Sequence, residues 1–344
     1  MTLQFDAALG ALKQGGSARS AGERFNARLE DLQHFLGSEL SEVEQAIASV
    51  VADGPEPAVS AAQHLVSRGG KRVRPLALLL AARCFGGARR EALVQMAAVV
   101  ELVHSATLLH DDVVDEGMER RGAITARRLH GNGVSVLSGD LLLVNALDRT
   151  RRAAPELLDE LISTLRRLVD GEIIQLRGRT ELDVSEATYE RILMDKTASL
   201  FALATRAGAR LAGADAEQES HLASFGEQLG IAFQLVDDVI DYEGNTSGKT
   251  LFADLLEGKL TLPLVIALER DKSLIELIEQ IHRGDDRSLA EVSQRVLSSG
   301  SCEEVRKRAR EYTRRALGAL DMIPPSPARE LLRLVAQEMT RRVF

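Results

Sequence analysis

The sequence has no tryptophan, and aromatic side chains make up only 3% of its 344 residues. Because strands are enriched in aromatic and β-branched residues, this scarcity favours helices over sheet. Only two cysteines are present, Cys84 and Cys302, and they lack CxxC spacing. That argues against a disulfide framework or a zinc site and fits a reducing cytoplasm. We therefore expect an all-α protein.

Long hydrophobic runs are also missing. No uninterrupted apolar run approaches the roughly 18–20 residues of a membrane-spanning helix, and residues 1–24 lack the basic and apolar blocks of a secretory signal. We expect a soluble, cytoplasmic protein without a transmembrane segment, which touches a membrane from one side at most. The net charge of −8 argues against a nucleic-acid partner, so local arginine clusters are better read as sites for small anions.

What is present suits one globular domain. Hydrophobic residues make up 45% of the sequence and charged residues 27%, which allows a sizeable core. Neither a domain linker nor an internal repeat is evident. We predict a single-domain bundle of antiparallel helices around a deep central cavity over residues 25–344, preceded by an N-terminal extension over residues 1–24 that is mobile or wraps around a partner subunit.

The chain is arranged around an acidic stretch at the end of a long apolar helix predicted from Glu91. Helical periodicity places Asp111 and Asp115 on one face, with Asp112 beside them. Acidic residues have the wrong sign for the C-terminal end of a helix dipole, and they repel one another, so a cation must hold them together. Mg²⁺ binds carboxylate oxygens and commonly bridges to substrate phosphates. Taken alone, the stretch is more often a solvated helix end.

A second acidic stretch changes that weighing. Asp237, Asp238 and Asp241 follow an apolar helix predicted from about His221, too far along the chain for local turn chemistry to explain both. Inward-projecting carboxylates on facing helices are a usual way to build a metal site in a helix bundle. Two acidic helix ends facing each other across a cavity would therefore make a clamp for metal ions and a diphosphate.

Basic residues complete the pattern. The segment Gly69–Pro75, GGKRVRP, presents three cations from a glycine-containing turn just before a helix, where a phosphate could meet guanidinium groups and free backbone amides. Arg120 and Arg121 follow the first acidic stretch directly. Each group alone would be a surface basic patch, but beside the acidic stretches both predict anion binding.

These motifs occur in a fixed order along the chain: GGKRVRP, HDDVVD followed by RRG, GEIIQL from Gly171, the pair Lys196-Thr197, FQLVDDVID, and GK followed by DLLEGKLTLP up to Pro263. In this order they resemble the trans-isoprenyl diphosphate synthases, also called polyprenyl synthetases, over roughly residues 25–344. The stretch from Thr107 to Asp115 is most similar to the long-chain branch, the octaprenyl diphosphate synthases in particular.

The resemblance implies an Mg²⁺-dependent prenyltransferase and a homodimer. An allylic diphosphate would ionise, the double bond of isopentenyl diphosphate would attack the carbocation, and a proton would leave; membrane contact would serve product release. About two or three Mg²⁺ ions, bridged by the substrate diphosphate, are implied. Their expected ligands are Asp111, Asp112, Asp115, Asp237, Asp238 and Asp241.

The resemblance also implies roles for basic and polar residues. The allylic diphosphate would be held by Arg120, Lys196, Lys249 and Lys259, and isopentenyl diphosphate by Lys71, Arg72, His104 and Arg121. Thr197 and Gln234 would act beside Lys196, close to the reacting carbon.

Product length is predicted from the helix before Asp111. Val103, Ala106 and Thr107 put no aromatic ring across the expected path of the growing chain, which indicates a heptaprenyl to decaprenyl product, octaprenyl first. One departure from the family pattern is the loop Thr250–Ala253 between Lys249 and Asp254, where many relatives carry a small glycine. If that glycine serves a turn with positive φ, Phe252 must send the loop along another path.

Four alternatives stay open at this point. A shorter-chain farnesyl or geranylgeranyl diphosphate synthase would need a floor on another helix. A class I terpene cyclase would be expected to lack the GGKRVRP turn, and a non-catalytic subunit of a heteromeric prenyltransferase to lose one acidic stretch. A purely structural helical protein would show no Mg²⁺-dependent release of diphosphate.

Overall fold

The computed structural model describes residues 36–86, 89–120, 122–181, 185–243, 252–283 and 286–341. The first helices are α3 (Gly37–Val51), α4 (Ala58–Val66), α5 (Val73–Arg83), α6 (Arg90–Val114), α7 (Ala126–His130), α8 (Asn132–Ala153) and α9 (Leu158–Glu181). They are followed by α10 (Glu186–Leu193), α11 (Ser199–Leu211), α12 (Ala216–Glu243), α13 (Ala253–Leu256), α14 (Leu262–Arg270), α15 (Leu274–His282), α16 (Leu289–Ser298), α17 (Ser301–Asp321) and α18 (Pro327–Arg341). The all-α prediction is confirmed; the extension predicted over residues 1–24 lies outside the described residues.

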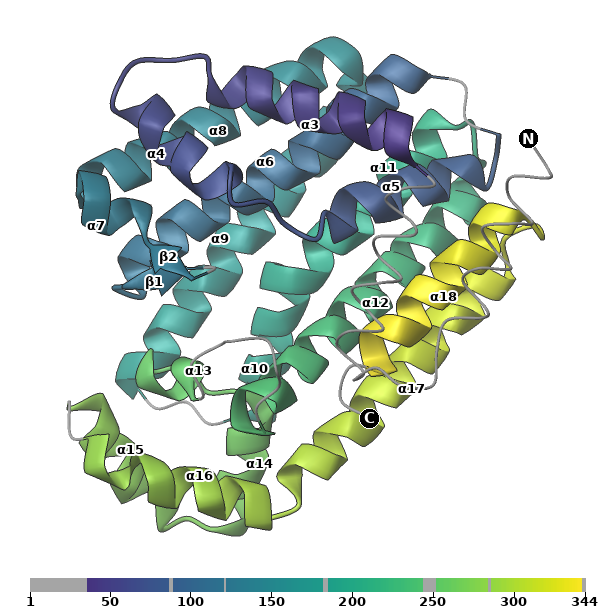
Figure 1. Ribbon diagram of the computed structural model, residues 1–344. Coiled ribbons are helices and arrows are strands. Elements are labelled where there is room, and N and C mark those ends of the chain that lie inside the picture. Colours follow the sequence, from purple (N-terminus) through teal and green to yellow (C-terminus); the bar gives the residue numbers. More distant parts are fainter. Residues whose placement is uncertain are drawn as a thin grey trace.

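Two long helices organise the bundle. α6 packs along α8 and also contacts α3 and α5, whereas α12 packs between α11 and α17. The helices α14, α15 and α16 lie together at the lower end of the view in Figure 1. Because α6 and α12 each carry an acidic stretch near the C-terminal end, this packing decides where those stretches lie.

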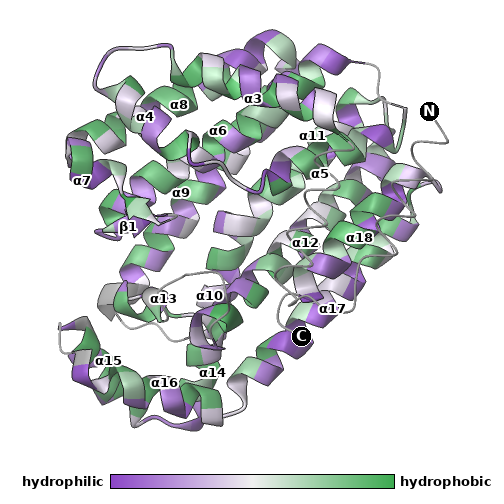
Figure 2. Cartoon of the chain, in the orientation of Figure 1, coloured by the Kyte–Doolittle hydropathy of each residue, from purple (hydrophilic) through white to green (hydrophobic). Residues whose placement is uncertain are grey.

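The apolar sequence of α6 makes it the core helix of the first half. Its residues from Met96 to Val100 are fully buried, and Figure 2 shows hydrophobic residues along both α6 and α11. By length and composition α6 would also suit a membrane span, but 78% of its apolar window is buried inside the protein. Core helices of globular proteins pass the same test, so α6 is no evidence for a membrane protein.

Glycines allow the central helices to approach one another closely. A Cβ on Gly208 of α11 would lie 2.2 Å from the carbonyl oxygen of Leu78 on α5. A Cβ on Gly226 of α12 would lie 2.5 Å from the carbonyl oxygen of Phe201 on α11. Since backbone atoms cannot move aside like a flexible side chain, only glycine fits these two crossings.

Four connections in the described chain contain short elements of their own. The polar segment after the first acidic stretch contains an antiparallel hairpin of β1 (Glu119–Arg120) and β2 (Ala123–Ile124) and then α7. The chain around Lys196 forms one π-helical turn, η2 (Met194–Ala198), between α10 and α11. Short 3₁₀ turns, η1 (Pro155–Leu157) and η3 (Asp286–Ser288), precede α9 and α16. The described chain after α13 holds five α-helices, α14 to α18.

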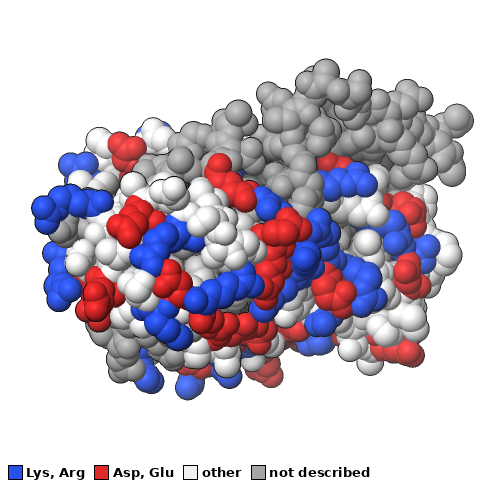
Figure 3. Space-filling view, turned by 90° about the horizontal axis from the view of Figure 1, so that it is seen from below, with Lys and Arg blue, Asp and Glu red and all other residues white. Residues whose placement is uncertain are grey.

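The surface mixes charges of both signs. Figure 3, seen from below, shows lysine and arginine side chains interspersed with aspartate and glutamate over the visible face. On α17 the arginines pair with neighbouring glutamates, as Arg308 does with Glu304 at 2.8 Å. Exposed pairs of this kind contribute little to stability, so the apolar core is the main source of stability.

The close approach of α5 and α11 predicts a specific loss of stability. Gly208→Ala should lower the free energy of unfolding by about 1–3 kcal/mol, because the added methyl group meets the carbonyl of Leu78. Gly318→Ala on α17 is the matched control, since a Cβ there meets nothing within 4 Å. It should raise stability by roughly 0.5–1 kcal/mol through helix propensity. Urea denaturation measures both, and equal stability of the two variants would contradict the packing described.

Candidate active site

The first acidic motif lies at the C-terminal end of α6, where cations from remote segments pair with its carboxylates. The Nε of Arg120 donates to Oδ1 of Asp112 over 2.5 Å, and the Nζ of Lys259 lies 2.7 Å from Oδ2 of Asp115. Asp112 is only 1% exposed. Burial raises the pKa of its carboxyl group, although Arg120 opposes the shift. The chain therefore offsets the repulsion between these aspartates with its own side chains.

Arg120 owes its position to the β1–β2 hairpin. Its residue pair in the hairpin is Ala123, and Gly122 between them takes a positive φ of 72°, which suits glycine. The hydroxyl of Thr125 donates to the carbonyl of Gly117 at 2.9 Å and ties the hairpin back to the end of α6. Arg121, the other predicted diphosphate ligand of this segment, lies outside the described residues.

Asp111 faces a mixture of charges from other elements. Burial raises the pKa of its carboxyl group to about 6; the charge of Lys196 opposes this, while Glu172 and Asp115 add to it. Lys196 belongs to η2 and Glu172 to α9. Residues of the KT and GEIIQL motifs therefore lie close enough to Asp111 to act on its charge.

The three aspartates of the second acidic motif, on α12, have different surroundings. Asp237 is half-buried and acts electrostatically on Arg74 of α5. Asp238 and Asp241 are buried, and the carbonyl of Asp241 accepts a hydrogen bond from the N–H of Phe252 at 3.1 Å. Of the three, Asp237 is therefore the one that solvent reaches most.

Asp238 is held by neighbouring elements. Its Oδ2 accepts hydrogen bonds from the Tyr189 hydroxyl at 2.6 Å and the Leu262 N–H at 3.3 Å, and its Oδ1 accepts one from Gln234 at 3.0 Å. Burial raises its pKa to about 7, and the charge of Asp254 adds to the shift, whereas the hydrogen bonds oppose it. The carboxylate predicted as a supporting metal ligand thus joins α12 to α10 and to the start of α14.

The η2 turn connects α9 to the second acidic helix, α12. The Nζ of Lys196 forms an ion pair with Glu172 and donates to Oε1 of Gln175 at 3.1 Å, both on α9. The next residue, Thr197, donates from its hydroxyl to Oε1 of Gln234 on α12 at 3.2 Å. Consecutive side chains of one turn therefore reach opposite sides of the site.

The segment from Phe252 to Lys259 makes a second connection. Its first residue bonds to the carbonyl of Asp241 on α12, and its last places Nζ beside Asp115 on α6 and 2.5 Å from Glu257. Burial opposes the charge of Lys259, but Asp115 and Glu257 outweigh it and raise its pKa above the ordinary value. Lys249, predicted as an allylic diphosphate ligand, lies outside the described residues.

Phe252 keeps the backbone conformation that a glycine would adopt. Its φ is +62°, an uncommon value for a bulky residue. The ring packs edge-on against Tyr242, with centroids 5.9 Å apart and planes at 64°. Residues 244–251 of the loop lie outside the described residues, so the expected change of its path stays a prediction. At Phe252 itself, aromatic packing offsets part of the backbone strain.

The GGKRVRP turn directs its arginines to different places. Arg72 has a left-handed backbone with φ of 49° and is 6% exposed. Its guanidinium donates to Glu44 of α3 at 2.5 and 3.0 Å and to Glu101 of α6 at 2.7 Å. Predicted as a ligand of isopentenyl diphosphate, Arg72 is instead engaged by two carboxylates of the protein.

Arg74 was missed by the sequence analysis. Its guanidinium carbon lies 4.6 Å from the ring centroid of Phe201, and its buried Nε has no hydrogen-bond partner in the described part of the chain. Burial lowers its pKa to about 10, opposed by Glu101 and Asp237. The sequence did contain a signal for Arg74, since it is the third cation of GGKRVRP. Because it follows Arg72 by two residues, its side chain points in a different direction from that of Arg72. Lys71 is exposed at the same turn.

The remaining predicted residues lie along α6. His104 and Thr107 are partly exposed, and the Thr107 hydroxyl donates to the carbonyl of His104 at 2.8 Å. Val103 and Ala106 are fully buried in the core. Thr107 is thus the predicted chain-length residue that retains exposure in this form of the protein.

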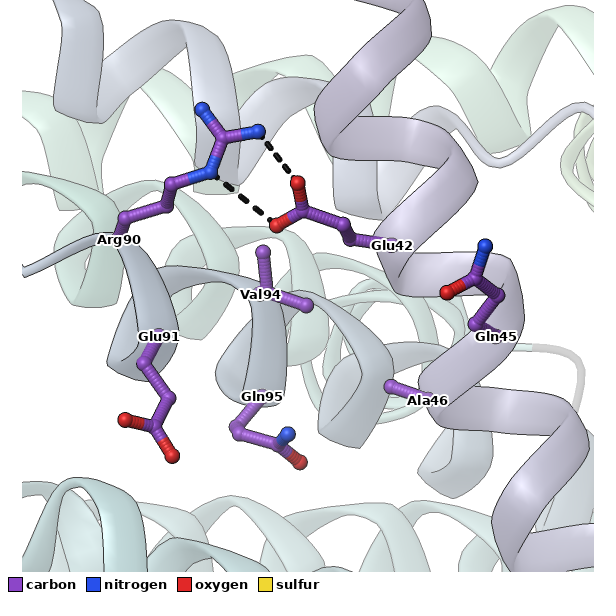
Figure 4. A pocket seen from close by; sticks show the side chains of 7 residues that line it. All are labelled: Glu42, Gln45, Ala46, Arg90, Glu91, Val94 and Gln95. Atoms are coloured by element: carbon purple, nitrogen blue, oxygen red, sulfur yellow. Dashed lines mark hydrogen bonds and ion pairs between the residues drawn. The ribbon is translucent and has the colours of Figure 1, made fainter.

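A separate hollow of about 550 Å³ lies at the other end of α6, about 30 Å away at the helical rise per residue. Figure 4 shows Arg90 and Glu42 paired across its rim, with Glu91 and Gln95 on α6 and Gln45 on α3. None of the acidic motifs or the basic turn contributes to it, so it is not part of the candidate site.

The metal-binding capacity of the site rests on its carboxylates. Across the described ranges, no three His, Cys, Asp or Glu side chains are grouped as a ready-made metal site. However, Oδ2 of Asp112 is buried without a hydrogen-bond partner among the described residues, while its Oδ1 is held by Arg120. An anionic oxygen in that position suits a hard cation that takes its other ligands from water and phosphate.

Comparison with known proteins agrees with this geometry. Residues 56–298 match the family model for polyprenyl synthetase. The chain is 38% identical over 313 residues to octaprenyl diphosphate synthase of Escherichia coli (strain K12), covering 88% of this chain and 96% of that one. It is 37% identical to an all-trans-nonaprenyl-diphosphate synthase (geranyl-diphosphate specific) of Rhodobacter capsulatus, covering 88% and 94%.

A solved structure shares the fold at similar coverage. The polyprenyl synthase from Caulobacter crescentus CB15, complexed with calcium and isoprenyl diphosphate, superposes with a TM-score of 0.85 at 34% identity, over 91% of this chain and 97% of that one. The order of motifs, the arrangement of helices and these similarities lead to one conclusion. The chain belongs to the polyprenyl synthetase family.

Proposed function

We propose that this protein condenses isopentenyl diphosphate with an allylic diphosphate, giving a long-chain all-trans polyprenyl diphosphate and pyrophosphate. The observation that carries the proposal is that cations from other elements act on both acidic motifs. Arg120 and Lys259 pair with the first motif, and Arg74 interacts with Asp237 of the second. Octaprenyl and nonaprenyl diphosphate synthases among the relatives favour the long-chain product. A cyclase or a non-catalytic subunit has no comparable support, since both acidic motifs and the basic turn are complete.

The first task of the site is to bind the allylic diphosphate and accept its departing charge. Asp111, Asp112, Asp115, Asp237 and Asp241 are the residues that would hold Mg²⁺, and two or three ions would supply positive charge at the leaving group. Arg120, Lys196, Lys249 and Lys259 would bind the same diphosphate directly. Preorganised charges of this kind stabilise a transition state because they need no rearrangement during the reaction.

Asp238 is proposed to position α12 rather than to bind a metal ion. Both of its oxygens already accept hydrogen bonds, from Tyr189, Gln234 and the Leu262 amide. A charge buried so deeply is costly unless it is fully hydrogen-bonded. These bonds fix the helix end on which Asp237 and Asp241 stand.

The second task is to hold isopentenyl diphosphate. We assign this role to Lys71, Arg74 and His104, with Arg121, while Arg72 stabilises the turn through Glu44 and Glu101. Arg74 has charge and an unsatisfied Nε on the side of Asp237. Arginine is well suited to such a role because its planar group binds phosphate oxygens in pairs.

The chemical step breaks the bond between the allylic carbon and the diphosphate oxygen, and the diphosphate takes the electron pair. The double bond of isopentenyl diphosphate then forms the new carbon–carbon bond, and transfer of a proton to the departed diphosphate restores a double bond. Thr197 and Gln234, which bond to each other at 3.2 Å, would turn their oxygens toward the developing cation. Apolar residues of the core exclude water from that cation.

An apolar surface supports the proposed homodimer. Exposed hydrophobic residues recur along α8 and α9 at helical spacing: Leu137, Val144, Ile162, Val169, Ile173 and Leu176. The two helices contact each other. A continuous exposed apolar stripe of this kind marks a protein interface, and a second copy of the chain is the occupant we propose.

Product analysis tests the proposed activity. Purified protein with Mg²⁺, isopentenyl diphosphate and farnesyl diphosphate should give products from heptaprenyl to decaprenyl, mainly octaprenyl, sized by chromatography. Thr107→Phe and Ala106→Phe should shorten them while the first condensation persists, because a ring then lies on α6 just before Asp111. A wild-type product that stops at geranylgeranyl would overturn the long-chain assignment.

Replacement of each arginine of the basic turn tests which of them binds isopentenyl diphosphate. Arg74→Gln should raise KM for isopentenyl diphosphate about 10- to 100-fold, the worth of a charged hydrogen bond, with little change in stability. Arg72→Gln should instead cost about 3–5 kcal/mol of stability, because Glu101 would be left buried and unpaired. Steady-state kinetics and thermal unfolding separate the two effects. If Arg72→Gln raised KM and Arg74→Gln lowered stability, Arg72 would be the ligand of isopentenyl diphosphate.

Charged substitutions test the interface. Val169→Asp together with Ile173→Asp should convert the dimer to a monomer, because two unpaired charges would be buried at the contact. Leu297→Asp is the control, since this residue is exposed on α16, away from the stripe. Light scattering after size-exclusion chromatography gives the mass of each. A wild-type monomer would refute the homodimer.

A further inference from the structure

The η2 turn interrupts the α-helical hydrogen bonding between α10 and α11, and contacts with its neighbours must maintain it. The N–H of Ser199 bonds to the carbonyl of Met194, five residues back, where an α-helix would use the residue four back. Such π-turns are rare and concentrate at functional sites. In a regular α-helix each residue turns the chain by about 100°, so removal of the extra residue would redirect Lys196 and Thr197.

Asp195 is buried beside this turn and tied to two arginines. It is 2% exposed, and its Oδ1 accepts a hydrogen bond from Nε of Arg167 on α9 at 2.8 Å. Nη2 of Arg167 also donates to the carbonyl of Met194 at 3.0 Å. Arg191 of α10 donates to Oδ2 of Asp195. One guanidinium thus holds both the carboxylate and the first carbonyl of the turn.

Close packing fixes the same turn from the side of α9. A Cβ on Gly171 would lie 2.9 Å from Cγ of Lys196 and 3.0 Å from Cβ of Asp195. The hydroxyl of Ser199 donates to the carbonyl of Asp195 at 2.5 Å. The turn is therefore gripped at its start by Arg167 and along its length by the bare backbone of α9.

We infer that Asp195 and Arg167 are positioning residues that maintain the π-turn, so that Lys196 reaches the first acidic motif and Thr197 reaches Gln234 on the second helix. This inference rests on the proposed prenyltransferase activity. Neither residue touches the substrates; both act through Lys196 and Thr197. A buried aspartate costs free energy unless it is paired. Here its partner Arg167 also binds the backbone carbonyl of Met194, so the pair holds the turn itself and does not merely join two helices.

Kinetics of three variants test the inference. Asp195→Asn and Arg167→Lys should each lower kcat/KM for the allylic diphosphate on the order of a hundredfold, as expected for a displaced catalytic group. KM for isopentenyl diphosphate should stay within about twofold, because Lys71 and Arg74 are elsewhere. Arg166→Ala is the matched control: it neighbours Arg167 on α9, but its side chain is 78% exposed and pairs with Asp170.

A double-mutant cycle distinguishes positioning from a general loss of stability. In a Lys196→Ala background, Asp195→Asn should cause at most a small further loss, because the group it positions is already gone. Additive losses, or an equal fall in the Arg166→Ala control, would overturn the inference. Should Asp195→Asn fail to fold, Arg167→Lys decides, since it keeps the charge and loses the two-point hold.

The outcome also separates this inference from the proposed function. An inactive wild-type protein would refute the proposed function and the inference with it. An active wild-type protein whose Asp195→Asn and Arg167→Lys variants keep full kcat/KM would refute the inference alone.

Discussion

Repulsion between aspartates at the ends of two helices is the constraint on which this site depends. Asp112 and Asp115 are buried near one another at a helix terminus whose dipole already disfavours negative charge. The chain meets this cost with Arg120 from a hairpin and Lys259 from a short helical segment. Neither cation comes from α6 itself, so the acidic end can be stable only when the surrounding elements are in place.

The same requirement explains why distant segments converge. The η2 turn and the Phe252–Lys259 segment each contact both sides of the site, through side chains in one case and through backbone and side chain in the other. Glycines at helix crossings then allow the supporting helices to approach closely enough for these contacts. The site is thus a property of the packed bundle, and no single helix contains it.

The sequence predicted the parts of the structure that depend on local periodicity. The apolar run before Asp111, the spacing of Asp237 and Asp241, and the scarcity of aromatic residues were enough to expect long helices and two acidic ends. The roles of Arg72 and Arg74 could not be separated, because both are arginines of one turn. Their difference comes from the left-handed backbone at Arg72 and from Glu44 and Glu101, which only tertiary packing brings to that point.

The other differences have a similar origin. The β1–β2 hairpin consists of two-residue strands, too short for an alternating pattern to reveal. The π-turn contains neither glycine nor proline, so none of the residues that usually interrupt a helix marks its place in the sequence. Asp238 looks like its neighbour Asp237 in the sequence, yet its partners Tyr189 and Leu262 come from elements far along the chain.

Phe252 begins the segment that places Lys259 beside Asp115. A non-glycine residue with positive φ costs free energy that this ring recovers by packing on Tyr242. Hydrophobic packing weakens on cooling and in urea. Lys259 ends the segment that Phe252 begins. The bond between Lys259 and Asp115 should therefore loosen in the cold or in mild denaturant while the helical bundle is still folded.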